Sequence, residues 1–207
     1  MTSSTSSDAT APLCSSSRVV LIKHGQTDWN FEHRFQGQTD IPLNDTGREQ
    51  AREAAQNLVD YAVALRQSEP GFEWEAVVAS PLSRALETAE IIADVLGLEV
   101  SGTYAGMQER SFGEAEGVQV TVDNWQNMEE TFAGIEPLEE LRARSIESLN
   151  VALQEHRGKN LIVVAHGMWI SQTLTELTGE EISIPVNASV TELPLELLRR
   201  DEAETRG

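Results

Sequence analysis

Three short apolar runs rich in β-branched residues constrain the fold of this chain most strongly. They span residues 18–23 (RVVLIK), 75–79 (EAVVA) and 161–165 (LIVVA), and a polar turn follows each directly. Runs of this kind are typical of strands buried on both faces, as in parallel sheets. We therefore expect them to be three strands of one sheet.

Helical patterns separate and follow these runs. Apolar residues recur at helical spacing in residues 46–66, 80–96, 138–157 and 168–177. The first pattern opens with TGRE, a capping-box signature at Thr46, and the second is expected to be capped by Ser80 and to stop at Gly97. Alternating strands and helices predict an α/β fold, a three-layer αβα sandwich with a mostly parallel central sheet.

The 207 residues suit one large domain, and 40% hydrophobic residues are enough for a sizeable core. The Ser/Thr-rich residues 1–17 are expected to form a disordered tail, residues 18–193 the domain, and residues 194–207 a second tail. Residues 98–137 show no strong period. A long irregular segment of this kind often lies over an active site.

The charge balance excludes some ligands. With 15 Lys and Arg against 34 Asp and Glu, the net charge is -19, which disfavours non-specific binding to nucleic acid or to anionic membranes. An anionic ligand would need cations gathered at one place. The single cysteine, Cys14, excludes an intramolecular disulfide, and there is neither a signal-like N-terminus nor a spanning apolar run. We therefore expect a cytoplasmic protein.

Cations and imidazoles follow the predicted strands. His24 and His166 come directly after two of them, and Arg84 falls in the first turn of the helix after the third. The carboxyl ends of parallel strands meet at one edge of a sheet, where ligands bind. Free backbone N–H groups at a helix N-terminus also favour phosphate. This edge is therefore predicted to bind an anion.

His24 is the candidate nucleophile at this edge. Neighbouring cations such as Lys23 lower the pKa of an imidazole from about 6.5 and keep its attacking nitrogen unprotonated at neutral pH. The second ring nitrogen must then be held, and a backbone carbonyl is the expected acceptor. His33 and His156 lack a comparable context and are expected on the surface.

Several runs together resemble the histidine phosphatase superfamily in its phosphoglycerate-mutase-like branch. The resemblance spans about residues 18–193, and Glu109 ahead of FG (112–113) and EG (116–117) matches the family's acid segment. The other matching runs are LIKHGQTDWN (21–30), RFQGQTDIPL (34–43), SPLSRA (80–85), ETA (87–89), VVAHG (163–167) and NASVT (187–191).

The resemblance implies a role for each matching residue. His24 would accept the phosphoryl group, and Glu109 would protonate the departing alcohol and later activate water. The phosphoryl oxygens and the substrate would be held by Arg84, His166, Lys23, Asn30, Gln36 and Gly37. No metal or other cofactor is implied.

Two departures from the family pattern stand out. Lys23 occupies a position where the family ordinarily has Arg, so a point charge replaces a two-pronged donor. We expect slower chemistry or a relaxed site, and we expect Lys23→Arg to raise the turnover number on a good substrate. Residues 134–137 (GIEP) replace a Gly-Glu-Ser segment near the substrate. The substrate contacts at that segment are therefore open.

The leading hypothesis is a metal-independent phosphatase that hydrolyses small phosphate monoesters through a phosphohistidine on His24. One alternative is a phosphoglycerate mutase with the same nucleophile, and another is a weakly active or non-catalytic phosphate-binding relative, because of Lys23. The expected partner is a small phosphorylated metabolite, not nucleic acid or membrane. Monomer and homodimer are both open.

Overall fold

The computed structural model of the chain describes residues 17–195. The predicted tails, residues 1–17 with Cys14 and residues 194–207, lie almost wholly outside this range. The described residues form a five-stranded sheet in the order β3-β2-β4-β1-β5. The strands are β1 (Val19–Lys23), β2 (Ala76–Ala79), β3 (Val100–Thr103), β4 (Leu161–Ala165) and β5 (Val190–Glu192). The first four run parallel, and β5 pairs antiparallel with β1.

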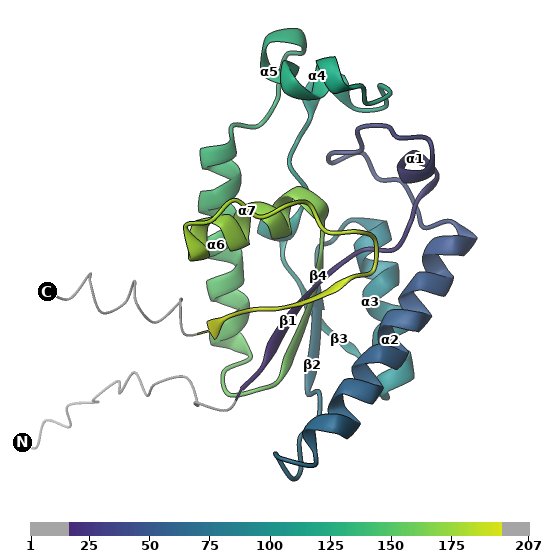
Figure 1. The fold of residues 1–207 in the computed structure, drawn as a ribbon, viewed down its shortest axis with the longest axis vertical. Helices are drawn as coiled ribbons and strands as arrows, with labels where there is room; N and C mark the ends of the chain where they lie inside the picture. Colours follow the sequence, from purple (N-terminus) through teal and green to yellow (C-terminus); the bar gives the residue numbers. More distant parts are fainter. Residues whose placement is uncertain (1–16, 196–207) are drawn as a thin grey trace, which may run out of the picture.

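Helices cover both faces of this sheet (Figure 1). Helices α2 (Asp45–Leu65) and α3 (Ser83–Leu96) lie on one face, and α6 (Leu138–Glu155) and α7 (Gly167–Thr178) lie on the other. Alternate residues of each strand therefore enter different cores: Ile22 packs in the α2/α3 layer, whereas Leu21 packs in the α6/α7 layer. The predicted αβα sandwich is confirmed.

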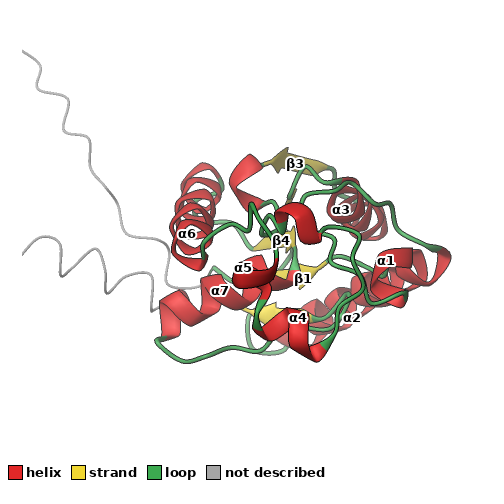
Figure 2. Cartoon of the chain, turned by 90° about the horizontal axis from the view of Figure 1, so that it is seen from above, coloured by secondary structure: helices red, strands yellow, loops and turns green. Residues whose placement is uncertain are grey.

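Short elements lie beyond the carboxyl ends of the parallel strands (Figure 2). They are α1 (Asp28–Phe31), the 3-10 turns at Ala105–Met107 and Gly113–Ala115, α4 (Val122–Gln126) and α5 (Met128–Thr131). Apart from α1, all these elements lie in residues 98–137, where the sequence shows no strong hydrophobic period. Among the helices of residues 17–195, none combines the length and the apolar character needed to cross a bilayer.

The two predicted N-caps, Thr46 and Ser80, are wrong, whereas the starts predicted at residues 138 and 168 lie within one residue of those observed for α6 and α7. Helix α2 begins at Asp45, because the Asn44 side chain accepts a hydrogen bond from the Gly47 backbone N–H (2.8 Å) and so provides the cap predicted for Thr46. Helix α3 begins at Ser83 and lacks a cap from Ser80. Its first N–H instead donates to the Asp40 carboxylate, 43 residues away (2.8 Å). Long-range caps of this kind leave no local sequence signal.

The ends of α3 and α7 follow the sequence prediction. Gly97 and Gly179 follow these helices with φ of 69° and 71°, in the left-handed region that glycine adopts readily. Strand β3 was not predicted. In its sequence, VSGT, partly buried and exposed residues alternate, and one of the four residues is glycine. It therefore lacks the continuous apolar run that marks β1 and β4.

Candidate active site

His24 lies directly after β1 and is almost completely buried. Its backbone N–H continues the sheet by donating to the Ala165 carbonyl (3.0 Å), which fixes the start of the turn. Its ring Nδ1 lies 2.7 Å from the Gly25 carbonyl oxygen. A carbonyl only accepts, so Nδ1 carries the proton and Nε2 of the neutral ring has a free lone pair. The Gly25 carbonyl is thus the acceptor that the sequence predicts for this ring.

The turn after His24 requires glycine. A side-chain carbon at Gly25 would lie 2.3 Å from the Gly47 carbonyl oxygen of α2, a distance that no packing tolerates. The Gly25 N–H donates to the Thr88 hydroxyl on α3 (3.0 Å). Helices α2 and α3 therefore hold the backbone that carries the His24 ring.

His166 occupies the N-cap position of α7, directly after β4, and its side chain makes no capping hydrogen bond. Its ring centroid lies 5.2 Å from that of His24, with the two ring planes inclined at 58°. Its Nε2 pairs with the Ser80 hydroxyl (2.7 Å), whereas its Nδ1 is buried and has no partner among the described residues. Ser80 thus orients His166 instead of capping a helix.

Arg84 reaches the same place from the first turn of α3 and is fully buried. Its two terminal nitrogens donate to the carbonyls of Gly37 (2.7 Å) and Thr39 (3.0 Å), and its buried Nε has no partner among residues 17–195. Burial lowers the pKa of Arg84 to about 10, although Glu109, Asp40 and Glu116 act in the opposite direction. The guanidinium remains charged at neutral pH.

The environment keeps both imidazoles neutral. Burial lowers the pKa of His24 well below 6.5, and the charges of Arg84 and Lys23 lower it further, against the contact with Gly25. Burial likewise lowers the pKa of His166, with Arg84 again the largest charge effect. At pH 7 an unprotonated His24 Nε2 therefore lies beside fixed positive charge.

Glu109 is buried and lies at the N-terminus of α7. Its two oxygens accept hydrogen bonds from the backbone N–H groups of Met168 and Trp169 (both 3.1 Å), and one also accepts from Arg110 N–H (2.8 Å). Because His166 is the residue that precedes this helix, Glu109 and His166 are neighbours in space. The Arg110 side chain points elsewhere and pairs with Glu129 (2.6 Å).

Arg144 on α6 holds the segment that carries Glu109. Its guanidinium donates to the carbonyls of Gly106, Gln108 and Glu109 at 2.9, 2.6 and 2.9 Å. It also makes a two-pronged contact with Glu136 (2.5 and 2.8 Å). Burial would raise the pKa of Glu136, but hydrogen bonds from Arg144 and the Ser111 backbone outweigh it and lower this pKa. We call this arrangement the Arg144–Glu136 clamp.

The clamp was not predicted from the sequence. Arg144 has no motif around it, and its acceptors are backbone carbonyls, which any residue supplies. Glu136 lies in the GIEP segment that departs from the family pattern. Its carboxylate contacts Arg144 and Ser111, and its backbone carbonyl accepts from Arg110 Nε (2.7 Å). Through Arg144, this segment supports the Glu109 loop.

Lys23 contributes a second cation, which is partly buried. Its ammonium donates to the Pro185 carbonyl (3.0 Å), in the segment that leads into β5. Burial lowers the pKa of Lys23, Glu109 partly offsets this, and Arg84 adds to it. An ammonium has three donors, so two remain for a ligand.

Asn30, Gln36 and Gly37 support the site in different ways. The Asn30 Oδ1 accepts from the Thr27 backbone N–H (3.2 Å) and from the Asn187 amide (3.1 Å). The Gln36 Oε1 accepts from the Thr27 hydroxyl (2.8 Å), and Gly37 supplies its carbonyl to Arg84. Asn187 also donates to the His24 carbonyl, so contacts through Asn187 and Thr27 join Asn30 and Gln36 to the turn that carries His24, and Gly37 is joined to Arg84. Gln36 and Gly37 are thus bound to protein groups.

The arrangement suits an oxyanion. Two buried nitrogens of the site, Arg84 Nε and His166 Nδ1, lack partners in the described chain, and buried polar atoms in folded proteins normally have one. Arg84 Nε is a donor, and His166 Nδ1 is a donor in the tautomer whose Nε2 accepts from the Ser80 hydroxyl. Within residues 17–195 no cluster of three His, Cys, Asp or Glu side chains could hold a metal ion.

Comparison with known proteins shows the family. The model of the histidine phosphatase superfamily, branch 1, matches residues 19–206, and the chain belongs to this family. "Uncharacterized phosphatase PhoE" of Bacillus subtilis is 38% identical over 161 residues, covering 78% of this chain and 77% of the relative. A "2,3-bisphosphoglycerate-dependent phosphoglycerate mutase 2" of Gloeobacter violaceus is 32% identical, covering 77% and 74%.

Solved structures agree with this assignment. Mycobacterial glucosyl-3-phosphoglycerate phosphatase in complex with VO3 superimposes with a TM-score of 0.69 at 27% identity, covering 86% of this chain and 92% of that one. The family match and the relatives named as phosphatases support a phosphatase as the general class of this protein.

Proposed function

We propose that the protein hydrolyses phosphate monoesters through a phosphohistidine on His24, without a metal. The observation that carries the proposal is the His24 ring itself: its Nδ1 is held by the Gly25 carbonyl, and its pKa is lowered by burial and by Arg84 and Lys23. A buried neutral imidazole with one nitrogen free is a nucleophile.

In the first step His24 Nε2 attacks phosphorus, the P–N bond forms, and the ester P–O bond breaks. Arg84 and His166, with their free donors, and Lys23 hold the phosphoryl oxygens, whose charge must be stabilised in the transition state. Glu109, in its protonated form, transfers its proton to the departing alcohol oxygen, which leaves as a neutral alcohol.

In the second step water attacks the phosphorus of the phosphohistidine. Glu109, now a carboxylate, accepts a proton from that water as the P–N bond breaks. Phosphate leaves, and His24 regains its lone pair. Glu109 lies beside His166, on a loop held by the Arg144–Glu136 clamp. This position supports its two roles, as the acid of the first step and the base of the second.

A phosphoglycerate mutase is the second candidate, because a mutase is among the relatives. It would use the same nucleophile but would return the phosphoryl group to the product before water attacks. Release of inorganic phosphate from a panel of monoesters, measured with and without 2,3-bisphosphoglycerate, distinguishes the two. A hydrolase releases phosphate without this primer, whereas a mutase interconverts phosphoglycerates only after priming.

The panel also tests for a non-catalytic binding protein. The proposal predicts phosphate release that is lost in Arg84→Met and retained in Arg52→Met, a matched change at a half-exposed arginine of α2. Binding of phosphate without any release from the panel would contradict the proposal.

A further inference from the structure

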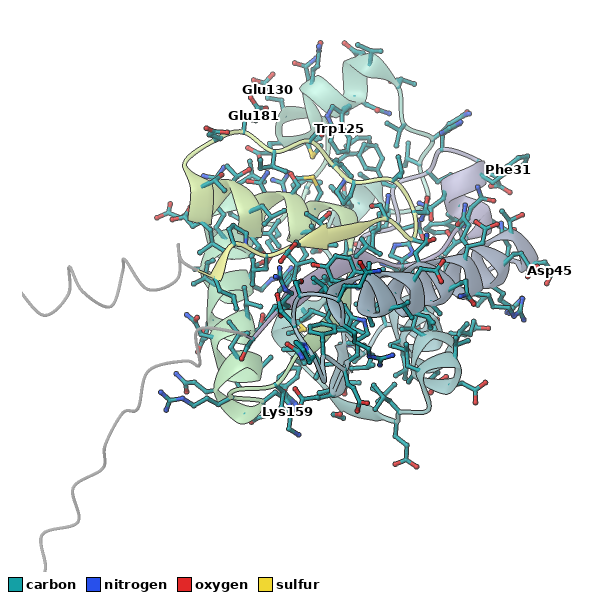
Figure 3. All side chains as sticks on the ribbon, turned by 60° about the horizontal axis from the view of Figure 1, so that its bottom comes forward. Phe31, Asp45, Trp125, Glu130, Lys159 and Glu181 are labelled. Atoms are coloured by element: carbon teal, nitrogen blue, oxygen red, sulfur yellow. The ribbon has the colours of Figure 1, made fainter. Side chains whose placement is uncertain are left out.

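Glu116 differs from the exposed carboxylates of this acidic chain, because hydrogen-bond donors of the protein surround it. Asp45, Glu130 and Glu181 are exposed and lie at the outer edge of the molecule in Figure 3. Glu116 is half-buried and contacts two segments of the candidate active site. A carboxylate that is held in this way can in turn fix the backbone that holds it.

The Glu116 carboxylate accepts four hydrogen bonds. Its Oε1 accepts from the backbone N–H groups of Gln38 (3.0 Å) and Phe112 (3.1 Å). Its Oε2 accepts from the backbone N–H of Thr39 (2.9 Å) and from the Thr39 hydroxyl. Hydrogen bonds to an ionised acceptor are stronger than neutral ones, so Glu116 fastens the loop of residues 37–39.

Arg84 binds the same loop from the other side. Its two terminal nitrogens donate to the carbonyls of Gly37 (2.7 Å) and Thr39 (3.0 Å). The Gly37 carbonyl and the Gln38 N–H belong to one trans peptide group, so they point in opposite directions. The guanidinium therefore lies at the negative end of this peptide dipole and the Glu116 carboxylate at its positive end, and each hydrogen bond strengthens the other.

The loop is also fixed at its glycine and at the residue that follows it. Gly37 has φ of 55°, and an added side-chain carbon would collide with the Glu116 carboxylate. Asp40 accepts from the backbone N–H (2.8 Å) and the hydroxyl (2.7 Å) of Ser83, the first residue of α3. Because α3 carries Arg84, the loop is joined both to the guanidinium and to its helix.

The loop contacts leave part of the guanidinium for a ligand. A guanidinium has five N–H donors in one plane, and each loop carbonyl accepts from one terminal nitrogen of Arg84. Its buried Nε has no partner among residues 17–195. Since the group is planar, the two loop contacts fix the direction of the Nε–H. Burial lowers the pKa of Arg84, and Glu116 is one of three carboxylates that oppose this effect.

Resting on the proposed function, we infer that Glu116 is a positioning residue of the reaction. Through the loop of residues 37–39, it fixes the Arg84 guanidinium in the orientation that holds the phosphoryl oxygens. Gln38 Nε2 also donates to the Glu109 carbonyl (3.2 Å), but Arg144 and the N-terminus of α7 hold Glu109 independently. Loss of the Glu116 charge is therefore expected to affect Arg84 and to spare Glu109.

Glu116→Gln tests the inference by calorimetric titration with orthovanadate, which forms a five-coordinate adduct on a nucleophile and so resembles the transition state. An amide has one acceptor oxygen instead of two, so it cannot accept from both Gln38 and Thr39. Small misplacements of a catalytic group cost up to about a hundredfold, and we expect vanadate to bind about ten- to a hundredfold more weakly. We expect kcat to fall similarly. Glu114→Gln, at an exposed carboxylate two residues away, is the matched control and should change neither.

The same substitution in an Arg84→Lys background shows whether Glu116 acts through Arg84. Lysine keeps the positive charge but has no planar fork for the loop to orient. In this background Glu116→Gln should weaken vanadate binding by less than about threefold, because the two residues form one coupled unit. An equal loss in both backgrounds would overturn the inference.

A comparison of leaving groups separates Arg84 from Glu109. The phosphoryl group is the same in p-nitrophenyl phosphate and in an alkyl phosphate, but only the alkyl phosphate needs a proton donor. A loss through Arg84 should therefore lower kcat equally for both substrates. A loss confined to the alkyl phosphate would show that Glu116 acts on Glu109 and would contradict the inference.

Thr39→Val decides the matter if Glu116→Gln does not fold. Valine keeps the shape and the backbone of the loop and removes only the hydroxyl that donates to Glu116. We expect vanadate to bind about two- to tenfold more weakly, and the effect to vanish in the Arg84→Lys background. An unchanged affinity for vanadate would then overturn the inference.

The inference and the proposed function fail separately. Titration with vanadate requires no turnover, so the absence of phosphate release from every monoester would end the hydrolase proposal and leave the titration result in place. If phosphate is released and Glu116→Gln binds vanadate as the wild type does, the inference about Glu116 fails alone.

Discussion

His24 and His166 link the stability of the folded protein to pH. Burial and nearby cations lower both pKa values below 6.5, so the unfolded chain binds protons at a pH where the folded chain does not. The free energy of unfolding should therefore fall as the pH drops below about 6.5, by at most about 1.4 kcal/mol per pH unit for each histidine.

Urea unfolding at pH 7.5, 6.5 and 5.5 measures this slope. His24→Asn removes one of the two groups and should make the slope shallower over the same interval. A slope that is the same in the variant, or stability that rises as the pH falls, would contradict the lowered pKa of His24 in the folded state.

Lys23 makes a prediction about turnover. Its ammonium already gives one donor to Pro185, whereas arginine could keep that contact and present a second, parallel N–H to a phosphoryl oxygen. We expect Lys23→Arg to raise kcat severalfold on a good substrate. An unchanged or lower kcat would contradict this expectation. It would show that lysine at this position is not a defect relative to the arginine of the family.

At the scale of whole elements, the Arg144–Glu136 clamp fastens the Glu109 loop to α6. Glu136→Gln keeps the shape but removes the charge that pairs with Arg144 and accepts from Ser111 N–H. We expect stability to fall by about 1–3 kcal/mol. We also expect kcat to fall more for alkyl phosphates, which need a proton donor, than for p-nitrophenyl phosphate, which does not.

The comparison of these two substrates separates positioning from general damage. Equal losses on both substrates would contradict a role for the clamp in placing Glu109. Glu139→Gln at an exposed position in the first turn of α6 is the control, and it should alter neither kcat.

The elements also differ in how far the sequence predicts them. β1, β2 and β4 are continuous apolar runs, and the alternation of strand and helix along the chain is enough to place His24, Arg84 and His166 at one sheet edge. The cap from Asp40 and the clamp were not predicted, because they depend on partners that only the folded backbone brings together. The cap from Asn44 is local, three residues from Gly47, and was missed because the neighbouring TGRE run also fits a capping box. Glu109 was selected by family resemblance alone, and its surroundings depend on the N-terminus of α7, which is distant in the sequence.

At the scale of the whole molecule, a strongly acidic protein holds a small group of positive charges, of which Arg84 is buried and Lys23 is partly buried. Arg84 lowers the pKa of Lys23, and burial disfavours the charge of both side chains. A bound oxyanion offsets the cost of burying these two positive charges, and it does so in the folded state only. Inorganic phosphate should therefore raise the unfolding temperature, and at one hundred times its dissociation constant it should add about 2.7 kcal/mol.

Thermal unfolding with increasing phosphate, at constant ionic strength, measures this effect. It should disappear in Arg84→Met and persist in Arg52→Met. Stabilisation that persists in Arg84→Met would place the phosphate somewhere other than this site.

The most direct test of the central claim is a rapid acid- and base-quench experiment with a 32P-labelled monoester. We predict a covalent label that is stable in base and labile in acid, that maps to the peptide containing His24, and that is retained in His33→Ala but absent in His24→Ala. Phosphate release by His24→Ala at the wild-type rate, or a label on another residue, would contradict the account.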